Sequence, residues 1–211
     1  MTIHDLSVPV VHGRDWYAEA GCPPVSLEQV GSYEEGWVSH QLTLMVLNGT
    51  TYLETAAHLY PDMPTLDQVP PERFLTRAFV VRLDGSRQEL PAPSAELPGF
   101  RPDEDAILLH CGWDSHVEAE DYYHASPYFG PELQAWLLNH RPAILGGDML
   151  SFDHPRDATM PFLHAFFRTG GMILCPLVGL SALPPVVTLC CAPVKLTGSS
   201  AAPCRVLAWT T

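Results

Sequence analysis

Short apolar runs bounded by Gly, Pro or Asp recur along this chain. These runs are residues 78–83, 106–110, 143–145, 173–174 and 186–196. Runs of this length, without polar alternation, are typical of strands buried on both faces. Residues 41–47 instead alternate weakly between apolar and polar positions, which predicts a strand that delivers residues 48–52 into a turn.

Two segments carry the spacing of helices rather than strands. Residues 131–139 place Leu133, Trp136 and Leu137 at helical intervals behind a proline in the first turn. Residues 162–168 repeat the same spacing with aromatic side chains. Strands mixed with short helices predict an α/β fold with a mixed sheet. No internal repeat or low-complexity linker interrupts the chain, so we expect residues 1–211 to form one domain.

Charge and hydropathy restrict the possible partners. The 211 residues carry a net charge of −13 with histidine counted as neutral. Nucleic acids and anionic membranes both select basic surfaces, so we expect neither as a partner. The first 30 residues lack a basic stretch leading into an apolar run, and no apolar segment is long enough to span a bilayer. We therefore expect a cytoplasmic protein.

One segment, residues 48–58 (NGTTYLETAAH), concentrates side chains suited to catalysis. It resembles the signature H-x-G-T-H-x-D-x-P-x-H of the cyclase family that includes the bacterial kynurenine formamidases. In that family the segment supplies two metal-binding histidines, a metal-bridging aspartate and a catalytic histidine. Those positions fall on Asn48, Tyr52, Glu54 and His58 of this chain.

Further blocks resemble the same family in the same order. They are residues 3–7 (IHDLS), 65–70 (TLDQVP), 108–114 (LLHCGWD), 126–128 (SPY), 147–153 (GDMLSFD), 164, 170–184 and 203–206. The resemblance thus covers nearly the whole chain. It implies a mixed, partly barrel-like β-sheet flanked by short helices, and a homodimer or larger homo-oligomer.

The metal ligands implied by the resemblance are mostly replaced. A third histidine ligand of the family falls on His164, and a glutamate ligand falls on Cys175. Asn48 and Tyr52 are poor zinc ligands, because an amide oxygen binds weakly and a phenol must first ionise. We therefore expect no metal cofactor. The alternative is a single zinc ion, whose ligands would be Glu54, His58, His164 and Cys175.

The remaining side chains form an acid–base set. Glu54 in an enclosed apolar pocket would have a raised pKa, and His58 four residues later could exchange protons with it. Tyr52 could donate a hydrogen bond to a developing oxyanion, and His164 is the fourth catalytic candidate. The candidates for substrate contact are Asn48, which could orient a carbonyl, Trp113 and Cys175. For Trp113 a structural role at a strand end, and for Cys175 a place in the core, are the competing interpretations.

Three functions are compatible with these residues. The first is a metal-independent enzyme that performs ring closure, dehydration or rearrangement of a small natural-product intermediate. The second is a metal-dependent amide or ester hydrolase with an altered ligand set. The third is a non-catalytic binding protein that keeps the fold. We expect the first, because Glu54, His58 and His164 are all retained.

Overall fold

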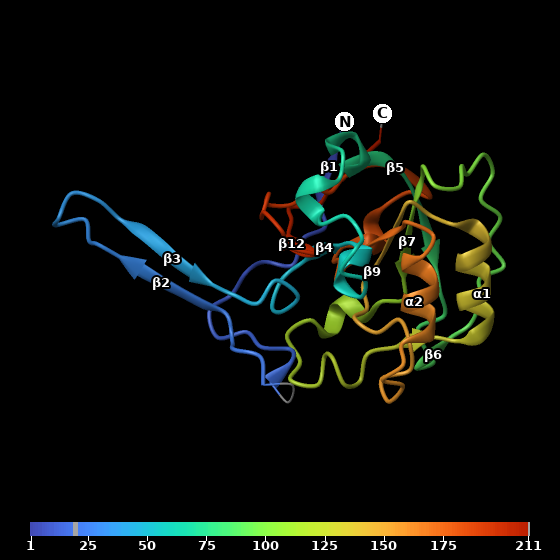
Figure 1. Cartoon of the computed structure of the whole chain (residues 1–211), viewed down its shortest axis with the longest axis horizontal. Helices are drawn as coiled ribbons and strands as arrows, with labels where there is room; N and C mark the ends of the chain where they lie inside the picture. The colour runs from blue at the N-terminus through green and yellow to red at the C-terminus, as the bar shows by residue number, and fades with distance from the viewer. Residues whose placement is uncertain (19–20, 211) are drawn as a thin grey trace.

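The computed structural model describes residues 1–18 and 21–210, and within them a nine-stranded sheet forms the centre of the body (Figure 1). Its strands are β1 (Ile3–Asp5), β4 (Tyr52–Glu54), β5 (Leu75–Arg82), β7 (Ala106–His110), β9 (Ile144–Gly147), β10 (Met172–Cys175), β11 (Val186–Cys190), β12 (Ala201–Pro203) and β13 (Leu207–Trp209). They lie in the order β1-β13-β11-β5-β7-β9-β10-β4-β12. The sheet curls into a half-barrel, which agrees with the expected partly barrel-like fold.

The sheet is mixed. Strands β5, β7, β9 and β10 run parallel to their neighbours in this series, whereas the strands on either side pair antiparallel. The parallel strands are the apolar runs of the sequence. Four of the five residues of β7 are fully buried, as expected for a strand covered on both faces.

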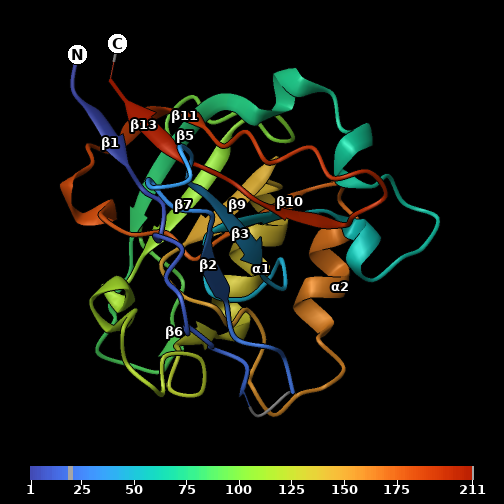
Figure 2. The same cartoon turned by 90° about the vertical axis from the view of Figure 1, so that its left-hand side faces the viewer.

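Helices α1 (Pro131–His140) and α2 (Pro161–Phe167) lie beside each other on one face of the sheet (Figure 2). Each begins with a proline, which suits the first turn because the N–H there has no partner within the helix. Both helices were predicted to within one residue at each end. The described residues also contain the 3₁₀ helices η2 (Ala56–His58), η3 (Leu66–Gln68), η4 (Pro71–Phe74), η5 (Trp113–His116) and η6 (Leu180–Ala182).

Alternation along the strands divides the core into two apolar clusters. Ile107 and Leu109 pack in the cluster under the helices, and Leu108 packs in the cluster on the opposite face. In β4, Tyr52 belongs to the helix-side cluster and Leu53 to the other. Because side chains alternate with a period of two, Glu54 shares the face of Tyr52. The side chains that carry the proposed chemistry therefore face the helices.

Two strand predictions are corrected by the structure. Residues 41–47 do not form one strand, because β3 (Ser39–Thr43) ends before the apolar part of that segment. β3 pairs only with β2 (Ser26–Val30), in a hairpin that projects from the body as an arm. Residues 186–196 form a strand only as far as Cys190, since the chain then leaves the sheet towards Pro193.

A small separate sheet completes the described strands. It pairs β6 (Glu89–Leu90) in parallel with β8 (Tyr128–Phe129). Among the described residues, none of the helices has both the length and the apolar character required to cross a bilayer.

Candidate active site

Strand β4 positions the catalytic candidates. It lies between β10 and β12, where Tyr52 is paired with Cys175 and Glu54 with Ile173. The preceding turn requires Gly49, which has φ +78°, and a Cβ at this position would lie 2.4 Å from a methyl group of Val25. The segment predicted to be a turn at residues 48–52 is thus a turn that passes directly into a buried strand.

Glu54 and His58 lie together. The 3₁₀ helix η2 turns the chain so that Nδ1 of His58 is 3.1 Å from Oε1 of Glu54. The Glu54 side chain is 4% exposed, whereas that of His58 is 33% exposed. Despite this proximity, the orientation is not that of a hydrogen bond, and Oε1 has no hydrogen-bond partner. A buried, unpartnered carboxyl oxygen is costly, so it marks a position where a ligand or proton donor is expected.

Burial sets the protonation of this pair. Desolvation raises the pKa of Glu54 to about 8, as the sequence led us to expect. Desolvation also lowers the pKa of His58 from its ordinary value of 6.5. Both shifts disfavour the charged form of the group concerned. At pH 7 the neutral carboxylic acid and the neutral imidazole are therefore the favoured forms.

Glu54 and His58 line a pocket of about 350 Å³ on the helix side of the sheet. Tyr52 lies at the same wall. Most of the remaining lining is apolar or aromatic: Tyr17, Cys22, Met45, Leu47, Tyr123, Leu150, Phe152, Pro155, Ala158, Met160 and Leu163. The other polar lining residues are Ser151, Asp153, His154 and Asp157. Small-molecule sites commonly combine apolar walls with a few polar groups in this way.

Tyr52 connects the pocket to the core below it. Its hydroxyl hydrogen-bonds with Cys175 and with Tyr17, and burial raises the pKa of Tyr52 well above 10.0. Burial also raises the pKa of the Cys175 thiol. Cys175 is fully buried and is not part of the pocket lining, so substrate contact through this residue is not supported.

Asn48 has a structural role instead of the expected contact with substrate. Its side-chain oxygen accepts a hydrogen bond from the backbone N–H of Trp16 at 2.9 Å, and its amide nitrogen donates to Asp15 at 2.9 Å. Asn48 is fully buried and lies outside the pocket lining. These hydrogen bonds hold the N-terminal segment against residues 48–58. They leave no side-chain group of Asn48 directed at a substrate carbonyl.

Trp113 and His164 also lie outside the pocket lining. The indole of Trp113 donates to the carbonyl of Tyr122 at 3.0 Å and stacks on the ring of His116. Nδ1 of His164 lies 2.8 Å from the hydroxyl of Tyr60. The structure therefore favours the structural interpretation of Trp113 and does not bring His164 into the catalytic set.

The side chains present at the family's metal position do not fit a metal centre. Asn48 has no free donor atom there, and Tyr52 is held as a neutral phenol. Among the described residues, only one group of three or more His, Cys, Asp or Glu side chains has its ligand atoms within 4.8 Å of one another, and it lies elsewhere. The alternative zinc ligands Glu54, His58, His164 and Cys175 are therefore not assembled.

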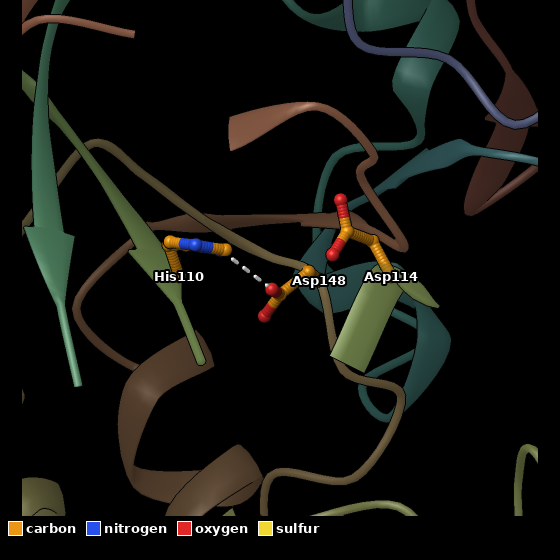
Figure 3. Close-up of side chains that lie close together, drawn as sticks. All are labelled: His110, Asp114 and Asp148. Carbon is orange, nitrogen blue, oxygen red and sulfur yellow. Dashed lines mark hydrogen bonds and ion pairs between the residues drawn. The ribbon is translucent and has the colours of Figure 1, made fainter. Parts of the chain in front are cut away.

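That group is His110 at the end of β7, Asp114 in η5 and Asp148 directly after β9 (Figure 3). Its residue types could hold a divalent cation. Nδ1 of His110 lies 2.9 Å from Asp148, and this hydrogen bond raises the pKa of His110. None of these three residues was among the site residues expected from the sequence.

Backbone donors already engage both carboxylates of this group. Asp148 accepts hydrogen bonds from the N–H groups of Cys111 and Gly112 at 3.0 and 2.8 Å, and also from His110. Asp114 accepts from the N–H of Gly179 at 2.9 Å. A carboxylate offers about four acceptor positions, and these donors occupy most of those on Asp148. The group therefore acts as a clamp that joins three loops.

Several residues of the pocket had no signal in the sequence. The rings of Tyr17 and Tyr123 pack against each other at an interplanar angle of 56°, with centroids 4.5 Å apart, although the residues are more than 100 positions apart in the chain. The carboxylate of Asp153 accepts hydrogen bonds from the N–H groups of Phe162 and Leu163 at the start of α2. Only the tertiary fold brings these residues to the motif.

The curled mixed sheet and its pocket are those of a small α/β enzyme. The chain belongs to the cyclase family, whose model, described as "Putative cyclase", matches residues 4–154. No curated protein matches the sequence significantly.

Several solved structures share the fold over nearly the whole chain. An isatin hydrolase bound to the product analogue thioisatinate has a TM-score of 0.81 at 17% identity, covering 98% of this chain and 91% of its own. Isatin hydrolase A from Labrenzia aggregata, bound to benzyl benzoate, has a TM-score of 0.77 at 22% identity, covering 100% and 94%. A predicted metal-dependent hydrolase from Bacillus stearothermophilus has a TM-score of 0.79 at 17% identity, covering 98% and 97%. At these identities the likeness establishes the fold.

Proposed function

We propose that this protein is a metal-independent acid–base enzyme that performs dehydration, ring closure or a related rearrangement of a small natural-product intermediate. The observation that carries the proposal is the unpartnered, buried Oε1 of Glu54, 3.1 Å from Nδ1 of His58 at the wall of a pocket. An acid and a base that are both neutral near pH 7 can exchange protons with a substrate without prior charge separation.

The lining of the pocket indicates the kind of substrate. Within the described part of the chain, neither lysine nor arginine lines it, whereas the carboxyl side chains of Asp153 and Asp157 do. A phosphate or carboxylate on the substrate would therefore be disfavoured electrostatically. The aromatic walls formed by Tyr17 and Tyr123 suit a flat, uncharged molecule. A neutral aromatic compound of modest size fits best.

Dehydration of a β-hydroxy ketone illustrates the chemistry. His58 accepts a proton from the carbon beside the carbonyl, while Glu54 donates its proton to the departing hydroxyl. The carbon–hydrogen electron pair forms the new double bond, the carbon–oxygen bond breaks, and water leaves. The imidazolium then loses its proton and Glu54 regains one, which restores both neutral groups. No activated water is consumed.

Amide or ester hydrolysis is the second candidate, and the fold likeness to isatin hydrolases favours it. In that reaction His58 would remove a proton from an attacking water, and Glu54 would protonate the leaving group. A single acid or base group supplies only ~10²–10⁴-fold acceleration, which is modest for amide hydrolysis without a metal. The side chains at the family's metal position do not form a metal centre that would provide a second means of activating the water.

A paired assay of EDTA-treated protein separates the two candidates. Neutral aromatic β-hydroxy ketones would be monitored by mass spectrometry for loss of water, and isatin by absorbance for ring opening. We expect dehydration without added metal, abolished in Glu54→Gln and retained in the exposed control Glu96→Gln. Turnover of isatin that appears only after zinc or manganese is added would overturn the proposal and favour the hydrolase.

A further inference from the structure

The three side chains that replace metal ligands of the family are all connected to one short segment near the N-terminus. Asn48 accepts a hydrogen bond from the backbone N–H of Trp16 at 2.9 Å. Tyr52 hydrogen-bonds with the hydroxyl of Tyr17 and with Cys175. The replaced ligand positions therefore form a connected set whose pocket-lining end is Tyr17.

Tyr17 is held at both its backbone and its ring. Oδ1 of Asp15 accepts from the N–H of Tyr17 at 2.9 Å, and the same oxygen accepts from the side-chain amide of Asn48 at 2.9 Å. The ring of Tyr17 packs against that of Tyr123, with centroids 4.5 Å apart. A side chain held in this way loses little further freedom when a substrate binds. Tyr17 thus has the preorganisation that a hydrogen-bond donor in a catalytic site requires.

Tyr52 itself does not suit the role of oxyanion donor that the sequence suggested for it. A phenol has a single O–H to donate, and the hydroxyl of Tyr52 already has two partners within the protein. Tyr52 is also only 4% exposed. Its hydroxyl is therefore committed to the interior and not to a ligand.

The acceptor strengths of the two partners set the direction of the chain of hydrogen bonds. A thiol sulfur is a weak acceptor, so the O–H of Tyr52 is donated preferentially to the oxygen of Tyr17 and not to Cys175. The O–H of Tyr17 is then left for a group in the pocket. A phenol that accepts one hydrogen bond becomes a stronger donor of its own, because hydrogen bonds in a chain polarise one another.

We infer that the hydroxyl of Tyr17 is the hydrogen-bond donor for the carbonyl oxygen of the substrate. The side chains at the replaced ligand positions support this hydroxyl, so a set of polar protein groups polarises the carbonyl where metal hydrolases use a metal ion. The inference extends the proposed function, because it assigns the residue that binds the carbonyl of the β-hydroxy ketone.

The role of Tyr17 follows from where charge develops in the dehydration. When His58 removes the proton beside the carbonyl, the electron pair of the broken carbon–hydrogen bond moves towards the carbonyl oxygen. Tyr17 donates its hydrogen bond to this oxygen and keeps its own proton. The electron pair then forms the carbon–carbon double bond as the hydroxyl leaves with the proton of Glu54. Burial raises the pKa of Tyr17 well above 10.0, so the phenol remains a donor.

Infrared spectroscopy of a bound aromatic ketone tests the inference without turnover. Acetophenone has no hydroxyl to lose, so its carbonyl is observed unreacted in the pocket. In the wild type we expect the carbonyl band at lower frequency than in hexane, and Tyr17→Phe should return it towards the hexane value. The matched controls Tyr123→Phe and Ser151→Ala each remove another hydroxyl residue of the pocket lining and should keep the wild-type band.

Kinetics of the β-hydroxy ketone gives a second readout. Tyr17→Phe should lower kcat by ~10²–10³-fold with little change in KM, because the donor acts mainly on charge that develops in the transition state. Tyr52→Phe removes the support of Tyr17, so it should lower kcat less and shift the ketone band only part of the way. Circular dichroism of each variant shows whether the fold is kept.

The two readouts separate failure of this inference from failure of the proposed function. A ketone band that depends on Tyr17, in a protein that dehydrates none of the β-hydroxy ketones, would support the donor and refute the reaction. A wild type without a shifted bound band at millimolar acetophenone, or a shift that survives in Tyr17→Phe, would overturn the inference. A shift lost equally in either control, or full kcat in Tyr17→Phe, would overturn it as well.

Discussion

Nδ1 of His58 lies 3.1 Å from Oε1 of Glu54, yet the carboxyl oxygen has no hydrogen-bond partner. The two residues are four positions apart, and η2 between them brings the imidazole back over the strand that carries the acid. Both groups favour their neutral forms because burial penalises their charges. The pair is thus arranged to exchange a proton with something else in the pocket.

The rate should depend on pH in the form of a bell. Turnover needs protonated Glu54, so kcat/KM should fall above about pH 8, the pKa of that group. It also needs neutral His58, so the acidic limb should lie below pH 6.5 because the pKa of His58 is lowered. Steady-state kinetics from pH 4 to pH 10 measures both limbs. A rate that rises steadily through pH 8 would mean that an ionised Glu54 acts as the base.

Glu54 should lower the stability of the folded protein as the pH rises. Its pKa is raised from 4.5 to about 8, so between these values the unfolded state loses a proton that the folded state keeps. Stability therefore falls with rising pH in this window, and Glu54→Gln, which cannot ionise, removes that fall. We expect the stability of Glu54→Gln relative to wild type to increase by up to about 4 kcal/mol from pH 5 to pH 8. Urea unfolding at both pH values measures it, with Glu96→Gln as the control that should show no such increase.

Loss of either member of the pair should be severe and not additive. His58→Ala should reduce kcat by ~10²–10⁴-fold, because it removes a general acid or base. Glu54→Gln keeps the shape of the side chain but cannot donate the proton, so it should abolish turnover while substrate binding remains. If the two residues act as a unit, the kcat of the double variant should be little lower than that of the less active single variant. Additive losses in such a double-mutant cycle would show that the two groups act independently.

Cys175 provides a contrast, since it lies beneath Tyr52 and outside the pocket. Burial keeps it a neutral thiol, so Cys175→Ser should cost less than ~10-fold in kcat/KM, well short of the loss of an acid or base. Kinetics of the folded variant is the measurement. An inactive Cys175→Ser protein with unchanged circular dichroism would instead identify this sulfur as a nucleophile or metal ligand.

Local sequence patterns predicted the parts of the fold that depend on residues close together in the chain. The apolar run of β7 and the proline-led helix α1 follow from burial and helix spacing. The four-residue spacing of Glu54 and His58 also predicted their proximity and the raised pKa of the acid. In these cases the residues that decide the outcome are neighbours in the chain.

Other features depend on contacts between distant segments, which one sequence does not reveal. The apolar residues at 41–47 resemble a core strand, but the chain uses them partly in the arm and partly in the pocket wall. Asn48 occupies a ligand position of the motif, yet its amide binds Trp16 and Asp15, more than 30 residues earlier. Residues so far apart in the chain share no periodic sequence pattern that would predict their contact.

Infrared spectroscopy of Glu54 tests the central claim most directly, because it requires neither a substrate nor a known reaction. The difference spectrum between wild type and Glu54→Gln should contain the carbonyl band of a protonated carboxylic acid at pH 7. This band should disappear with a midpoint near pH 8. A carboxylate band at pH 7, with titration near 4.5 or with no titration because a metal holds the group ionised, would contradict the account.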